Sequence, residues 1–247
     1  MKKVIETTEE NPRESLEKAI REGDLETLLR KAGELHGHFC SYLAYGVKAG
    51  YLAVKELGIK NRGMEEVVAI VETNNCFSDG IQMVTGCTFG NNSLIFKDVG
   101  KTAVTVAKRD GSAVRIVLDP AYEKAVKDEY REANELWEKI VIKRDKATRE
   151  EQDRMMKLFA DMAFKELKKP AEKMFRITKM RIETPDYAPI FQSAICSICG
   201  ESTYKPLIRD GKPICLECAG NAYFLLDGAG IHRSKKEDKT VGRTVNR

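Results

Sequence analysis

Four of the seven cysteines form two pairs at the spacing of a metal site. Cys196 and Cys199 make one CxxC pair, and Cys215 and Cys218 make a second pair after fifteen intervening residues. Each pair places two thiolates on one tight turn, and four thiolates complete the tetrahedral shell that Zn²⁺ adopts in structural sites. A closed shell leaves no position for a substrate. We therefore expect one structural zinc ion per chain.

The residues around these cysteines predict a small zinc-finger module. The segment 209–213 (RDGKP) supplies a hairpin turn between the two pairs, and we expect a helix from Ala219 onward. A knuckle, a hairpin and a second knuckle that opens a helix describe a treble clef. About thirty residues bury too little apolar surface to fold alone, so metal binding must contribute the folding free energy.

A second group of metal-binding residue types lies in the N-terminal third of the chain. His36, His38 and Cys40 alternate within five residues, and Gly37 favours a loop in which the three side chains project to one side. A helix that begins at Ser41 would then stabilise a thiolate at Cys40. Imidazole and thiolate donors suit zinc, nickel, copper or iron. The alternative is that these side chains only pack in the core.

Three residues further along are candidate catalytic groups. Cys76 follows a predicted strand at 66–72, in the kind of connecting segment where catalytic residues gather. Asp79 is placed to cap a short helix at 81–85 or to act as an acid or base. Cys87 ends that helix and is expected to line the same pocket. The candidate ligands of a second metal ion are thus His36, His38, Cys40 and Cys76.

The rest of the chain predicts the elements that must position these groups. Two short amphipathic helices are expected over 13–32 with a break at Gly23-Asp24, and a longer helix over 41–57 ends at Gly58. The small residues Gly46, Ala49, Gly50 and Ala53 on that helix indicate the close approach of another backbone. Further strands are expected at 93–97, 101–108, 113–119 and 175–183, and charged helices at 121–142 and 148–167.

Composition excludes several classes of protein. Hydrophobic residues make up 42% of the 247 residues, which is enough for a core. No apolar run approaches the length of a membrane span, and the N-terminus lacks a signal peptide, so we expect a cytoplasmic protein without a membrane partner. The net charge of +4 lies entirely within residues 231–247. The balanced remainder argues against an extensive phosphate-binding surface, although nucleic acid remains a candidate partner of the basic tail.

Three of these stretches together resemble the FmdE-like family of formylmethanofuran dehydrogenase proteins. They are HGHFC at 36–40 with Gly46, NCFSDG at 75–80, and TGCTFGNNSL at 85–94 continuing to Lys101. The likeness covers about residues 32–108. The family usually has Pro-Gly where this chain has Ser41-Tyr42, and often Gly-Lys where it has Gly90-Asn91.

The resemblance implies an α+β fold: a core domain with a mostly antiparallel sheet and flanking helices, followed by the treble-clef module. It also implies an intertwined homodimer, other protein subunits as further partners, and a cleft in which Thr85 and Lys101 contact a cofactor or anion. We therefore expect a core domain at 1–188, a zinc finger at 189–230 and a basic tail at 231–247.

Three functions remain open on the sequence. The first is a metal-binding accessory or enzyme-like role in one-carbon or redox metabolism, related to methanogenesis. The alternative is a regulatory or adaptor protein whose zinc finger contacts protein or nucleic acid while the core senses a metal or metabolite. The third is a structural dimeric subunit. The chain has no ferredoxin-like cysteine run, so it is not by itself the catalytic component of the dehydrogenase.

Overall fold

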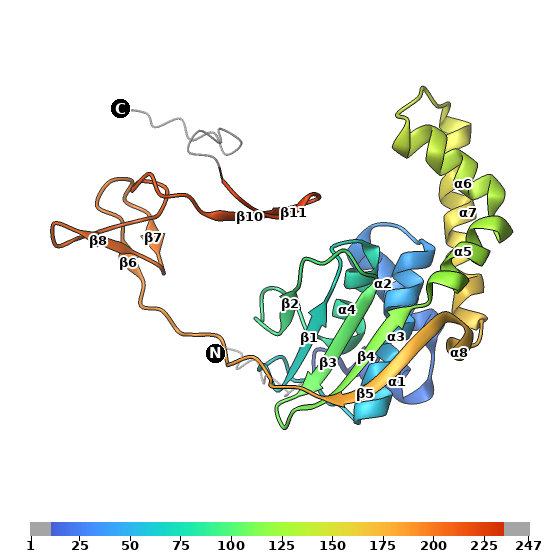
Figure 1. The fold of residues 1–247 in the computed structure, drawn as a ribbon, viewed down its shortest axis with the longest axis horizontal. Helices are drawn as coiled ribbons and strands as arrows, with labels where there is room; N and C mark the ends of the chain where they lie inside the picture. The colour runs from blue at the N-terminus through green and yellow to red at the C-terminus, as the bar shows by residue number, and fades with distance from the viewer. Residues whose placement is uncertain (1–10, 235–247) are drawn as a thin grey trace, which may run out of the picture. The chain divides into compact units, whose positions relative to one another are not determined.

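The chain forms two compact units, Met1–Pro185 and Asp186–Arg247. A computed structural model describes residues 11–234 (Figure 1). The first unit carries a sheet and its helices, and the second carries the cysteine pairs of the zinc-finger prediction. Each unit is described on its own below.

A five-stranded sheet organises the first unit. Its strands are β1 (Val67–Val71), β2 (Leu94–Phe96), β3 (Ala103–Lys108), β4 (Ser112–Leu118) and β5 (Phe175–Arg181), in the order β2-β1-β3-β4-β5. Only the β1–β2 pair is parallel. The α+β fold class with a mostly antiparallel sheet is therefore confirmed.

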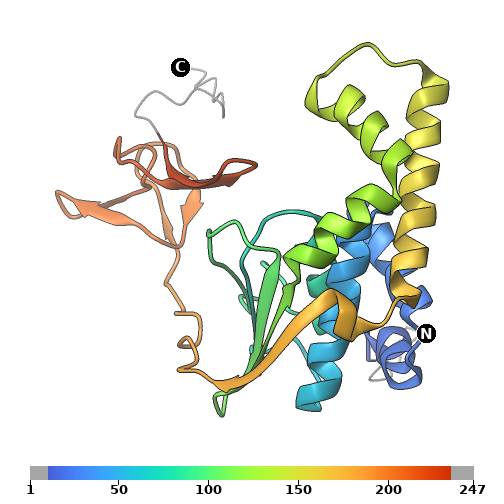
Figure 2. The same cartoon turned by 45° about the vertical axis from the view of Figure 1, so that its right-hand side comes forward.

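Four helices cover one face of this sheet: α1 (Glu14–Glu22), α2 (Leu25–His36), α3 (Ser41–Leu57) and α4 (Cys76–Thr85) (Figures 1 and 2). The predicted caps are present. The side chain of Asp24 accepts a hydrogen bond from the Thr27 amide at the start of α2, and Gly58 ends α3 with φ 60°.

Helix α4 begins five residues earlier than the sequence pattern predicts. The side chain of Asn75 accepts a hydrogen bond from the Phe77 amide at 3.0 Å and so caps the helix at Cys76 rather than at Ile81. Cys76 and Asp79 are therefore helical residues, and not residues of a loop. They lie in the first turn of α4, whose N-terminus carries a partial positive charge.

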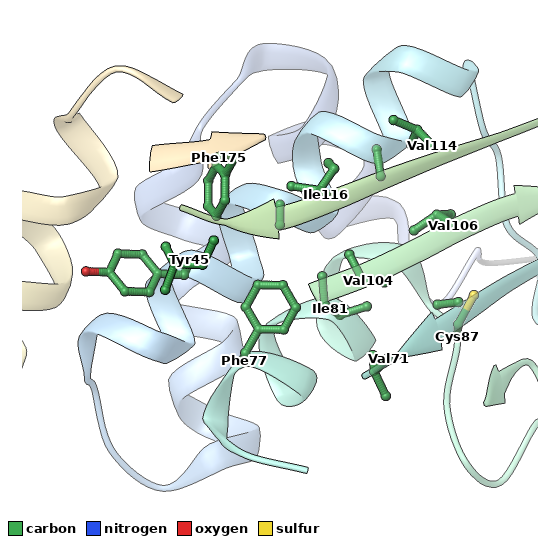
Figure 3. Packing of buried hydrophobic residues seen from close by; sticks show 14 of the residues in the cluster. Tyr45, Val71, Phe77, Ile81, Cys87, Val104, Val106, Val114, Ile116 and Phe175 are labelled. Carbon is green, nitrogen blue, oxygen red and sulfur yellow. The ribbon is translucent and has the colours of Figure 1, made fainter. Parts of the chain in front are cut away.

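The core lies between the sheet and helices α3 and α4. Alternate residues of β3 and β4, among them Val104, Val106 and Ile116, pack against Tyr45 of α3 and Phe77 of α4 (Figure 3). The strands alternate because successive side chains point to opposite faces of the sheet. This packing fixes the two helices that carry the N-terminal cysteines.

Helices α3 and α4 touch backbone to backbone through two glycines. A Cβ atom at Gly46 would lie 2.0 Å from the carbonyl oxygen of Phe77, and one at Gly80 would lie 2.5 Å from the amide nitrogen of Val47. The close approach predicted from the small residues of 41–57 is therefore present, and α4 is the backbone that comes close.

A helical arm follows the sheet in the chain. It consists of α5 (Pro120–Glu129), α6 (Arg131–Trp137), a π-helix (η1, Glu138–Ile142), α7 (Arg149–Lys168) and the short α8 (Ala171–Met174), and it extends beyond the sheet in both views. The single helix predicted over 121–142 is broken at Tyr130, where φ is −113° and ψ is 48°. The rings of Trp137 in α6 and Phe159 in α7 lie 5.7 Å apart and join these two helices.

One buried carboxylate fastens this arm to the core. Glu166 of α7 is fully buried, and it accepts hydrogen bonds from the hydroxyls of Tyr45 at 3.1 Å, Tyr130 at 2.9 Å and Tyr122. The ammonium of Lys169 lies 2.8 Å from it. Because the charge of Glu166 is paired and hydrogen-bonded, its burial is tolerated.

The second unit is built of short hairpins. They pair β6 (Ala194–Ile195) with β7 (Ser202–Thr203), β8 (Leu207–Arg209) with β9 (Lys212–Ile214), and β10 (Phe224–Asp227) with β11 (Gly230–Arg233). The prediction of a helix from Ala219 is wrong: within residues 186–234 the second knuckle leads into turns and then into β10. Most of the expected basic tail, 235–247, lies outside the described residues, and 231–233 belong to β11.

The glycine contact between α3 and α4 gives the first test. Gly46→Ala should lower the free energy of unfolding by about 2–3 kcal/mol, because the new methyl group must displace backbone atoms of α4. Gly90→Ala is the matched control, since nothing lies within 4 Å of its added Cβ. Urea denaturation of both variants measures the difference. Equal stability of the two variants would contradict the close contact.

Candidate metal centre

Four side chains converge at the start of two helices. One donor atom from each of His36, His38, Cys40 and Cys76 lies within 4.8 Å of every other. His36 is the last residue of α2, Cys40 caps α3, and Cys76 opens α4. His38 lies in the connection between α2 and α3. The structure thus brings together the four residues that the sequence predicts as ligands of a second metal.

Asp79 fixes the orientation of His36. The Nδ1 atom of His36 lies 2.7 Å from Oδ2 of Asp79, whose Oδ1 accepts a hydrogen bond from Gln82 at 3.0 Å. The remaining ring nitrogen, Nε2, is buried and has no hydrogen-bond partner among residues 11–234. A carboxylate that holds one imidazole nitrogen so that the other can bind a metal is a recurrent feature of metalloproteins.

The two cysteines differ in their electrostatic surroundings. A hydrogen bond from the Cys40 thiol, together with both histidines, lowers the pKa of Cys76 to about 5, although partial burial opposes this shift. The same hydrogen bond and burial raise the pKa of Cys40. Burial and the neighbouring His36 lower the pKa of His38. The pair therefore holds one thiolate beside a neutral His38, which is a state able to bind a metal.

These donors suit a tetrahedrally coordinated ion. Sulfur and nitrogen ligands at about 2.0–2.3 Å from zinc lie about 3.3–3.8 Å from one another. The separations of up to 4.8 Å are therefore within about an ångström of that geometry. The unpartnered Nε2 of His36 is the donor that such an ion would satisfy.

A cavity of about 1130 Å³ adjoins the group. His38, Cys40 and Cys76 line one wall, and the helical arm supplies the opposite wall. Aromatic and apolar side chains on the lining are Tyr42, Trp137, Ile142, Phe159 and Met162, and charged residues of both signs complete it. A group bound to the four donors would therefore be open to a small molecule on one side.

Sequence reasoning does not identify the arm as part of this cavity. The pattern marks Trp137 only as a position on an apolar helix face, although it is the single tryptophan of the chain and lies on a highly charged segment. The hydroxyl of Tyr42 donates to Glu123 of α5, which connects the metal-binding segment to the arm. The π-helix η1 also lines the cavity, and such helices are frequent at functional sites.

Three other predicted residues lie away from the four donors. Cys87 is fully buried in the core, where its thiol donates to the carbonyl of Val67 at 3.5 Å. The hydroxyl of Thr85 donates to the carbonyl of Ile81 at 2.7 Å. Lys101 is exposed, and its charge acts on Glu72. None of the three lines the cavity beside His38, so the structure does not support the common cleft expected for them.

The four C-terminal cysteines form the second donor group. The sulfur atoms of Cys196, Cys199, Cys215 and Cys218 also lie within 4.8 Å of one another. The amide of Cys215 donates to the Cys196 sulfur at 3.4 Å, and hydrogen bonds from the Cys199 and Cys215 amides lower the pKa of Cys196 to about 6. The arrangement matches the closed Cys₄ shell of a structural zinc site.

Among residues 11–234, no helix is both long and apolar enough to cross a membrane. The described part of the chain therefore offers no membrane-spanning helix.

Comparison with known proteins supports one family. The family model described as "FmdE, Molybdenum formylmethanofuran dehydrogenase operon" matches residues 35–176. A crystal structure of an FmdE-like protein of tungsten formylmethanofuran dehydrogenase, from Syntrophus aciditrophicus, superposes with a TM-score of 0.51 at 25% identity. The match covers 79% of this chain and 92% of that chain.

A curated relative from Archaeoglobus fulgidus is described as a probable S-adenosyl-L-methionine-binding protein. It is 36% identical over 230 residues, which make up 91% of this chain and 61% of the relative. The chain thus spans about three-fifths of that protein's length.

The family match includes all four donors of the core site and more than half of the chain. The chain belongs to the FmdE family.

Proposed function

We propose that this FmdE-family protein binds a transition-metal ion through His36, His38, Cys40 and Cys76 and uses it in an accessory or enzyme-like role in one-carbon or redox metabolism. The observation that carries the proposal is the buried Nε2 atom of His36, which lacks a hydrogen-bond partner in the described chain. It lies in a group that contains three further donors.

Metal binding explains these contacts better than packing does. Leaving a polar atom buried without a partner costs about 1–3 kcal/mol, so simple packing would favour an apolar side chain at position 36. The hydrogen bond to Asp79 also places the nitrogen that faces the other donors in its unprotonated form. Zinc, nickel, copper and iron are the ions that imidazole and thiolate donors favour.

The residues around the ion divide the work of such a site. A bound ion would supply Lewis acidity or, for a redox-active metal, an electron. Asp79 orients His36, and the first turns of α3 and α4 stabilise the thiolates of Cys40 and Cys76. Tyr42, Trp137 and Phe159 offer aromatic surface to a small molecule beside the ion.

The identity of that small molecule is not carried over from the Archaeoglobus relative. The match leaves about two-fifths of that protein outside it, and S-adenosyl-L-methionine binding can reside there.

The C-terminal cysteine group holds a structural zinc ion in this proposal, and both thiolate groups require the reducing conditions of the cytoplasm. We also propose that the protein is a homodimer. Exposed apolar side chains on the arm support this, namely Ile142 at 58% exposure and Met156 at 41%.

A second candidate function is that of an adaptor for another protein. The zinc module exposes large apolar side chains, including Ile190, Phe191, Ile198, Tyr204, Ile208 and Phe224. Such a concentration on a small module is typical of a protein-binding surface.

The proposal predicts two metal ions per chain. Elemental analysis of the purified protein should give two, and Cys40→Ser combined with Cys76→Ser should reduce the number to one, because two of four core ligands are lost. Cys87→Ala is the matched control and should retain both ions, since Cys87 lies outside both donor groups. One ion per chain in all three proteins would overturn the core metal centre.

Asp79 gives a test that leaves the ligands unchanged. Asp79→Asn should weaken core metal binding by about 10–100-fold, because the amide no longer holds the correct tautomer of His36. Asp128→Asn, which changes a carboxylate on the cavity wall, should leave the affinity unchanged. Competition with a colorimetric chelator measures both. Equal affinities for the two variants would remove the orienting role of Asp79.

The zinc module should depend on its ion for folding. A strong chelator should expose the backbone amides of residues 192–223 to rapid hydrogen exchange, while β3 and β4 remain protected. The reason is that the module has few buried apolar side chains, whereas the sheet has a core of its own. Continued protection of the module after verified zinc loss would contradict this.

A further inference from the structure

The three core cysteines are not equally accessible. Cys76 is partly exposed and lines the cavity, whereas Cys40 is buried and lies at the same wall. Cys87 is fully buried and does not line the cavity. A reagent that enters the cavity therefore meets the sulfur of Cys76 first.

Cys40 is placed to react next. Its sulfur lies within 4.8 Å of the sulfur of Cys76. The two cysteines sit at the first turns of α3 and α4, which the Gly46 and Gly80 contacts hold together. An accessible cysteine beside a sheltered second cysteine is the arrangement by which proteins convert oxidation into a disulfide.

We propose that Cys76 is an oxidation site for hydroperoxides, that Cys40 is its resolving cysteine, and that the resulting disulfide releases the core metal ion. The metal-release step rests on the proposed function, whereas the oxidation site itself does not. The redox state around the protein would then decide whether the core is metal-bound.

The reaction balances in two steps. The sulfur of Cys76 attacks one oxygen of the hydroperoxide, the O–O bond breaks, and the products are a sulfenic acid at Cys76 and an alcohol, or water from hydrogen peroxide. The sulfur of Cys40 then attacks the Cys76 sulfur and expels hydroxide, which leaves as water with the thiol proton. Two electrons pass from the two sulfurs to the peroxide.

Disulfide formation removes half of the donor set. A disulfide sulfur is no longer a thiolate, and the thiolate is the metal ligand. Only His36 and His38 would remain, and two imidazoles hold an ion far more weakly than the full set of four donors. The release would be reversed when a thiol reductant restores both cysteines.

The test uses the full-length, metal-loaded protein and hydrogen peroxide as the probe. After a stoichiometric dose, tryptic digestion should yield peptide 32–48, which contains Cys40, linked to peptide 63–97, which contains Cys76 and Cys87. One metal ion per chain should appear with the disulfide in a colorimetric assay. Reduction with dithiothreitol and addition of Zn²⁺ should restore it.

Three variants assign the roles. Cys87→Ala should give the same linked peptides, because Cys87 takes no part. Cys40→Ser should stop the reaction at a sulfenic acid on Cys76 that dimedone labels. Cys76→Ser should leave Cys40 reduced at the same dose. Circular dichroism of each variant, compared with the untreated protein, verifies that it is folded.

Two results would overturn the proposal separately. Oxidation of Cys40 in the Cys76→Ser variant at the unmodified rate, or loss of the linked peptide in the Cys87→Ala variant, would refute the oxidation site. A disulfide that forms without loss of an ion would refute the metal-release step and the core metal centre together, while the oxidation site would stand.

Discussion

The site depends on the backbone contact between α3 and α4. Gly46 and Gly80 have no side chain at the crossing, and a methyl group at either position would lie within 2.5 Å of backbone atoms of the opposite helix. Because Cys40 caps α3 and Cys76 opens α4, the crossing brings the first turns of both helices to one place. Two helix N-termini then act on the same pair of sulfurs, and each favours a thiolate. The metal donors are thus positioned by helix packing rather than by a dedicated loop.

The cavity depends on a different constraint, the burial of Glu166. Its carboxylate is reached by tyrosines from α3, from α5 and from the break between α5 and α6. A buried carboxylate that lost these donors would be costly, so the arm is held in one position relative to α3. That position places Trp137 and Phe159 opposite the donors of the core site. Binding residues far apart in the sequence therefore share one cavity through a network that touches none of the metal donors.

Much of this structure can be predicted from local sequence signals, and the remainder depends on distant contacts. Caps such as Asp24 and Gly58 act within one helical turn, so the bounds of α2 and α3 follow from the sequence. The early start of α4 does not, because an asparagine such as Asn75 is as typical of a loop as of a helix cap. Cys87 is close to Cys76 in the sequence, which suggests a shared pocket, but it follows α4 on the side of the core. The second wall of the cavity is not predictable in this way, because the link between Tyr42 and Glu123 spans 81 residues. The helix expected after Cys218 rests on an analogy with treble clefs, and the residues there instead turn into β10.

The two donor groups contrast in how they are held in place. In the C-terminal module four sulfurs from two turns surround the site, and few apolar side chains are buried there, so the ion and the fold depend on each other. In the core, α2, α3 and α4 pack on a sheet whose strands are fully buried in places, and most of this packing does not involve the donors. The core can therefore exist with or without an ion, and the free energy of binding is not consumed in folding. An ion that can leave without unfolding its site can be exchanged, sensed or released. That property separates a functional centre from a structural one, and here it follows from the position of the apolar core rather than from the chemistry of the ligands.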